Sequence, residues 1–216
     1  MMADMGMTMD MPWHAADFLF AFAMWAVMMV GMMMASAAPV MLLFAGMHRG
    51  HGGQRAPRVV FSFSAGYLLV WTAFSAGAAL AQWALHQAAM LSPAMTSSST
   101  RLSGAILIAA GIYQLTPFKA VCLTHCRSPL GFLMSHWREG ASGALRMGIE
   151  HGTYCLGCCW ALMCVLFVVG VMNLVWVAAM TIFVLVEKVG PAGAFVARVA
   201  GVAMIACGAR VWSASL

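Results

Sequence analysis

The chain has 216 residues, of which 63% are hydrophobic and 8% are charged, and its formal net charge is +5. A soluble domain carries about 25% charged residues, so this chain has too few polar side chains to solvate a globule of its size. The composition predicts an all-α polytopic membrane protein in contact with the lipid bilayer. No long basic run with interleaved aromatic residues is present, which argues against a nucleic-acid partner.

The first 17 residues are rich in methionine, and we expect them to form an external tail. Six of the first eleven residues are Met, and His14 follows. The segment is acidic and lacks the basic start of a secretory signal peptide. Thioethers with an imidazole are weak Cu(I) ligands, but a flexible tail anchored by Trp13 at the lipid headgroups is the simpler interpretation. Residues 18–216 are then predicted to form a single transmembrane helical domain.

Six apolar stretches follow the tail, and each is interpreted as a transmembrane helix of a bundle. They are residues 18–46, 59–86, 101–118, 151–171, 174–186 and 194–212. Pro39 is expected to kink the first span, and Pro117 to bend or break the third. Residues 131–150 contain too many charged side chains to span a membrane, so we predict a short interfacial helix after the third span.

Methionines also form a stripe along the first span: Met28, Met29, Met32, Met33 and Met34. Methionine at helical spacing is usually flexible packing, and that is the interpretation here. A transport path would need polar groups along it, and this stripe with Asn173 and Glu187 offers the only candidates. Metal binding is therefore better supported than metal transport.

Three thiols lie within five residues at the start of the fourth span, in the stretch HGTYCLGCCWALM. They are Cys155, Cys158 and Cys159, and on a helix they share one face with His151. Soft sulfur with one imidazole is a ligand set for Cu(I) or Zn. Cysteine is also a common small residue inside membrane helices, but three in five residues favour a metal site over packing.

A second group of thiols follows Pro117 at the end of the third span. Cys122 and Cys126 are four residues apart, with His125 between them. On a continuing helix the two cysteines share a face. This pair is a weak signal by itself, and it gains weight only if the fold brings it to the first group.

The distribution of Lys and Arg predicts the orientation in the membrane. Residues 47–58 and 119–146, with the turn near Lys188, hold most of the basic side chains and are expected in the cytoplasm. Both termini would then be periplasmic, in a bacterial inner membrane. The third span descends to one cysteine group and the fourth begins at the other, so both should lie at one depth on the cytoplasmic side. Thiols stay reduced there, which favours a metal site over a disulfide.

The two cysteine motifs resemble a bacterial family of predicted metal-binding integral membrane proteins that contain a domain of unknown function. The resemblance rests on GIYQLTPFKAVCLTHCRSPL (residues 111–130), MGIEHGTYCLGCCWALM (147–163), GVMNLVWVAAM (170–180) and the pair Glu187-Lys188. It implies a multi-span fold and a metal site at Cys122, Cys126, Cys155, Cys158 and Cys159. It implies no reaction.

Three functions remain open at this point. The first is a membrane protein that handles Cu(I), or Zn, through the cysteines, with His125 or His151 as an alternative ligand. The second is a non-catalytic subunit of a larger membrane complex. The third is a membrane thiol-disulfide oxidoreductase that uses Cys155-Leu-Gly-Cys158 at a helix start. Classical enzyme chemistry is poorly supported, because the chain has only six Asp and Glu and three of them lie in the tail.

Overall fold

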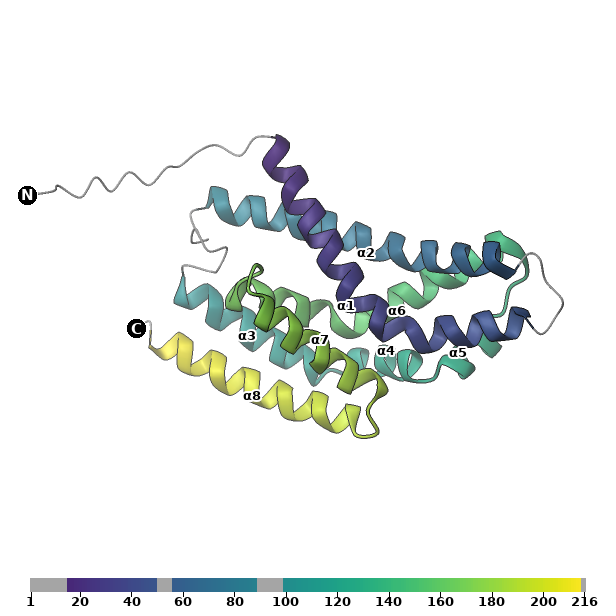
Figure 1. Ribbon diagram of the computed structural model, residues 1–216. Helices are drawn as coiled ribbons and strands as arrows, with labels where there is room; N and C mark the ends of the chain where they lie inside the picture. Colours follow the sequence, from purple (N-terminus) through teal and green to yellow (C-terminus); the bar gives the residue numbers. More distant parts are fainter. Residues whose placement is uncertain (1–14, 50–55, 89–98, 215–216) are drawn as a thin grey trace, which may run out of the picture.

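The computed structural model describes residues 15–49, 56–88 and 99–214, and this part of the chain is helical without a strand (Figure 1). The all-α class is therefore confirmed for these residues. The methionine-rich segment of residues 1–14, His14 included, lies outside them. The helices are α1 (Ala15–Arg49), α2 (Ala56–Gln87), α3 (Thr100–Gln114), α4 (Pro117–Arg127), α5 (Pro129–Ser135), α6 (Gly140–Val169), α7 (Leu174–Val189) and α8 (Gly193–Ser213).

Four of the described helices are long and apolar enough to cross a membrane, namely α1, α2, α6 and α8. Helices α3 and α4 meet at an angle of 64°, and they supply a fifth span if the bent pair is counted as one. Helix α7 has 16 residues and falls short of the length that a single crossing requires. The helical bundle is thus compatible with a membrane protein, while six spans remain a prediction.

Prolines act differently in the first and third predicted spans. Pro117 is the first residue of α4, and the hydroxyl of Thr116 accepts a hydrogen bond from the Lys119 backbone N–H at 3.3 Å. A proline at the first helical position replaces an N–H that has no helical partner, so the break expected at Pro117 is found. Pro39 lies inside α1, which continues past it and bends partway along its length (Figure 1). Such bends are typical of a proline within a helix.

The predicted interfacial segment, residues 131–150, is divided between two helices. Part of it belongs to the short helix α5, and the residues from Gly140 onward belong to α6. The fourth long helix therefore begins before His151, where the sequence had placed its start. The charged side chains that suggested an interruption pair with one another instead, because Glu150 Oε1 accepts from Arg138 at 3.2 Å and from Arg146 at 3.4 Å.

Helix α6 is the centre of the bundle and packs against α2, α3, α4 and α7. Its approach to α2 depends on two glycines. A Cβ atom at Gly148 would overlap the backbone carbonyl of Phe63, and one at Gly66 would overlap that of Leu145. Because these positions lack side chains, the two backbones come close, and Tyr67 of α2 faces the cysteine-bearing turns of α6.

Candidate metal centre

Four cysteines from α4 and α6 lie together, and we call Cys126, which is half-buried, with the buried Cys155, Cys158 and Cys159 the cysteine group. The three on α6 are at most 2% exposed. The sulfur of Cys158 lies 3.8 Å from that of Cys126, whose side chain also interacts with Cys155. In a tetrahedral site with metal–sulfur bonds of about 2.3 Å, neighbouring sulfurs are about 3.8 Å apart. The distance between the Cys126 and Cys158 sulfurs is therefore compatible with two ligands on one ion.

Cys155 is the most strongly contacted member of the group. Its sulfur accepts a hydrogen bond from the Lys188 ammonium at 2.9 Å and lies 3.1 Å from the Tyr67 hydroxyl. Lys188 also donates to Ser36 of α1 at 3.1 Å. A buried ammonium needs a negative partner, and the sulfur that it contacts would supply one as a thiolate, the form of cysteine that binds metal. Tyr67 of α2 and Lys188 of α7 thus contact one sulfur of α6, and Ser36 of α1 is linked to that sulfur through Lys188.

Glu187, the residue before Lys188, turns to a different partner. Its carboxylate pairs with Lys119 of α4 at 2.8 Å, and both side chains are almost fully buried. Gln114 donates to Glu187 at 2.9 Å, and Lys119 donates to Gln114. Glu187 therefore pairs with a lysine of α4 and not with its neighbour Lys188. The ion pair that exists instead ties α4 to α7 beside the cysteine group.

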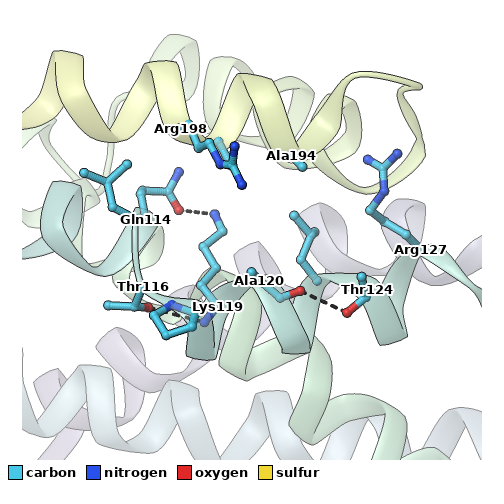
Figure 2. A pocket seen from close by; sticks show the side chains of 12 residues that line it. Gln114, Thr116, Lys119, Ala120, Thr124, Arg127, Ala194 and Arg198 are labelled. Carbon is cyan, nitrogen blue, oxygen red and sulfur yellow. Dashed lines mark hydrogen bonds between the residues drawn. The ribbon is translucent and has the colours of Figure 1, made fainter.

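A cavity of about 390 Å³ lies on the other side of Lys119, between α4 and α8. Figure 2 shows the Lys119 side chain directed toward Gln114, with Arg198 extending from α8 above it. Arg127, at the far end of the cavity, donates to the backbone carbonyls of Glu187 at 2.6 Å and of Pro191 at 3.3 Å. Arg127 of α4 therefore binds both the end of α7 and the turn that leads to α8.

The two candidate histidines pack against aromatic rings. His151 is 3% exposed, and its ring packs between aromatic rings, with centroids 5.0 Å from Phe132 and 5.9 Å from Tyr67. Its Nδ1 has no hydrogen-bond partner among the described residues. His125 stacks on Tyr154 with a centroid distance of 4.3 Å and an interplanar angle of 4°. Both rings serve as packing surfaces in this conformation.

Cys122 occupies the turn of α4 before Cys126 and faces a glycine of α6. A Cβ atom at Gly157 would come within 2.8 Å of the Cys122 sulfur, so this glycine allows α4 to approach. Cys122 is 7% exposed. The structure thus brings one of the two α4 cysteines to the α6 thiols and leaves the other against the α6 backbone.

The thiols of α6 are not yet arranged around a common centre. Within the described ranges, no set of three or more His, Cys, Asp or Glu has the geometry to hold an ion. The reason is visible in the side chains, because Cys158 and Cys159 both turn to the Cys155 carbonyl, at 3.0 and 2.9 Å. In the same conformation the Cys158 sulfur keeps its contact with the Cys126 sulfur at 3.8 Å.

The chain matches a known protein family over most of its length. The model of the family PpoB2, described as copper chaperone, matches residues 22–211. The chain belongs to this copper chaperone family. The match covers both cysteine motifs and the helices that carry them. No curated protein and no solved structure matches the chain.

Membership in a copper chaperone family agrees with the metal-binding part of the resemblance noted from the motifs. The side chains that sequence reasoning missed are those that contact the thiols from other helices, Tyr67 and Lys188. One signal in the sequence could have indicated that Lys188 contacts another helix. A lysine and a glutamate at the end of an apolar stretch are costly to bury, so each should have a specific partner elsewhere in the chain.

Proposed function

We propose that the chain is a membrane copper chaperone that holds Cu(I) between α4 and α6. Cys126, Cys155 and Cys158 would be the thiolate ligands, and Cys159 a further thiolate on the same face of α6. The observation that carries the proposal is the 3.8 Å approach of the Cys126 and Cys158 sulfurs from two different helices. Sulfur-only ligands select Cu(I) or Zn, and the family description favours copper.

The proposed orientation puts this site toward the cytoplasm of a bacterium, with both termini periplasmic. Two observations support it. The start of α1 and the end of α8 lie at one end of the bundle, and α5 with the starts of α2 and α6 lies at the other (Figure 1). The second end carries Arg58, Arg138 and Arg146, as expected for the cytoplasmic side of an inner membrane protein. Cys155 lies little more than one helical turn beyond Glu150, the last charged residue of α6.

The experiment is an anaerobic Cu(I) competition titration of the detergent-purified protein against the chelator bicinchoninate. We expect the wild type to hold Cu(I), and the variant Cys155→Ser/Cys158→Ser to bind it about 100-fold more weakly. The matched control is Cys164→Ser/Cys207→Ser, which removes two thiols farther along α6 and on α8. The proposal fails if the first variant and the control bind copper equally well.

The thiol oxidoreductase remains a second candidate, because the Cys126–Cys158 contact also suits a disulfide between α4 and α6. It requires an electron acceptor such as a quinone, which takes two electrons and two protons as the S–S bond forms. Quinone-dependent loss of two free thiols from the wild type, prevented by Cys126→Ser, would favour it over copper handling. The third interpretation, a subunit of a larger complex, predicts co-purifying proteins at fixed stoichiometry and is compatible with copper binding.

A further inference from the structure

A groove of about 750 Å³ lies beside α1, and methionines form an unusual share of its lining. Four of its twelve lining residues are Met, against about a tenth of the whole chain. They are Met24, Met28 and Met32 of α1, with Met172 from the turn between α6 and α7. We call this feature the methionine groove. Leucine would line an apolar groove equally well, so the choice of a sulfur-bearing side chain needs an explanation.

The three methionines of α1 are spaced four residues apart. On an α-helix such residues lie one above another, with a rise of about 6 Å from each to the next. Met32 is 2% exposed, whereas Met172 is 63% exposed. The groove therefore offers thioethers from two separate elements, and its lining ranges from open to fully buried.

Residues of α1 next to the buried end of the groove are linked to the cysteine group by hydrogen bonds. Met33, next to Met32, accepts a hydrogen bond from the Tyr67 hydroxyl through its backbone carbonyl at 3.1 Å. The same hydroxyl lies 3.1 Å from the Cys155 sulfur. One turn farther along α1, Ser36 accepts a hydrogen bond from Lys188, which contacts Cys155 as well. Two chains of contacts thus join this stretch of α1 to the same thiol.

We propose that the methionine groove binds Cu(I) transiently and passes it to the cysteine group, an inference that rests on the proposed function of that group. Thioethers are neutral, soft ligands that bind Cu(I) more weakly than thiolates do, so the ion moves toward Cys155 with falling free energy. In each transfer a Cu–thioether bond breaks as a Cu–thiolate bond forms. Any thiol proton is released to water, and copper remains Cu(I) throughout.

The sequence before α1 supports the direction of transfer. Six of the first eleven residues are Met, and they precede the helix that supplies three methionines to the groove. The start of α1 lies at the end of the bundle opposite the basic residues (Figure 1). Copper would therefore enter from the side of the termini and move along α1 to the thiols.

The first test is the rate of Cu(I) loading from its bicinchoninate complex, followed by stopped-flow absorbance on the full chain in detergent. The variant Met24→Leu/Met28→Leu/Met32→Leu/Met172→Leu keeps the volume and apolar character of the groove but removes its sulfurs. We expect it to load about tenfold more slowly than the wild type and to reach the same copper content. The matched control is Met34→Leu/Met134→Leu/Met180→Leu/Met204→Leu, which should load at the wild-type rate. Equal Cu(I) loading rates for the two variants would overturn the inference. The groove would then be a site that a lipid tail fills.

A second measurement separates this inference from the proposed function. In selenomethionine-labelled Cys155→Ser/Cys158→Ser protein, X-ray absorption of bound Cu(I) should show selenium neighbours. Adding the four groove substitutions should abolish them. Absence of selenium neighbours before those substitutions contradicts the groove, whatever the cysteine titration shows. Conversely, loss of tight binding in the cysteine variant supports the cysteine group even if the groove fails.

Discussion

The cysteine group is closed, whereas the methionine groove is open. Cys155, Cys158 and Cys159 are at most 2% exposed, and Cys155 is contacted by Lys188 and Tyr67 from other helices. The groove contains about 750 Å³ of unfilled space, and Met172 is 63% exposed on its wall. A buried site with a fixed ammonium suits tight binding of Cu(I). An open groove with neutral ligands suits transient binding of the same ion. This difference between the cysteine group and the methionine groove depends on the contacts that keep the cysteine group closed. Single substitutions can remove these contacts one at a time.

The largest effect is expected from Lys119→Met. The substitution leaves the Glu187 carboxylate buried without its cation, which typically costs about 3–5 kcal/mol. The free energy of unfolding in mixed micelles measures this loss. Because the pair ties α4 to α7, copper binding should weaken in the same variant.

The control for this prediction is Arg146→Gln. Its partner Glu150 lies near the start of α6, and the Arg146 side chain is 66% exposed. An exposed pair contributes about 0–1 kcal/mol, so this variant should unfold almost as the wild type does. Similar losses in the two variants would mean that Lys119 and Glu187 do not hold the cysteine group closed.

An intermediate effect is expected from Lys188→Met. It removes the ammonium 2.9 Å from the Cys155 sulfur, and with it the positive charge that stabilises a copper–thiolate centre. The Cu(I) affinity should fall about tenfold, as for other residues that support metal ligands. Lys188→Arg keeps the charge and should restore much of the affinity. If Lys188→Met binds copper as the wild type does, the ammonium has no role in the site.

The smallest effect is expected from Tyr67→Phe. The variant loses the hydrogen bond to the Met33 carbonyl and the contact with Cys155, while the ring remains in place. The loss of one buried hydrogen bond corresponds to about 1 kcal/mol in the free energy of unfolding. Copper affinity should change less than in Lys188→Met, and the reverse order would show that the hydroxyl matters more than the ammonium.

Local sequence rules predicted the elements that depend on local physics. The break at Pro117 follows from the missing N–H of proline, and the shared face of Cys155 and Cys158 follows from helical periodicity. The start of α6 was misplaced because Arg138, Arg146 and Glu150 resemble a polar interruption. In the structure these charges pair with one another, so the helix continues through them.

Contacts between distant helices could not be predicted from the sequence. Nothing near Lys188 in the chain indicates a cysteine 33 residues earlier as its partner, and hydropathy places Lys188 at a membrane surface. The surroundings of His151 could not be predicted from helical periodicity either. It shares a helical face with Cys155, yet its ring lies among Phe63, Tyr67 and Phe132, which come from two other helices. Helical periodicity predicts which residues share a face, but not which side chains of other helices surround them.

The central claim is that one copper ion joins α4 to α6 through sulfur, and X-ray absorption of the Cu(I)-loaded protein tests it most directly. The account predicts a first shell of sulfur alone at about 2.3 Å, with the sulfur count reduced by one in Cys126→Ser. An unchanged sulfur count in that variant, or nitrogen ligands in the wild type, would contradict it.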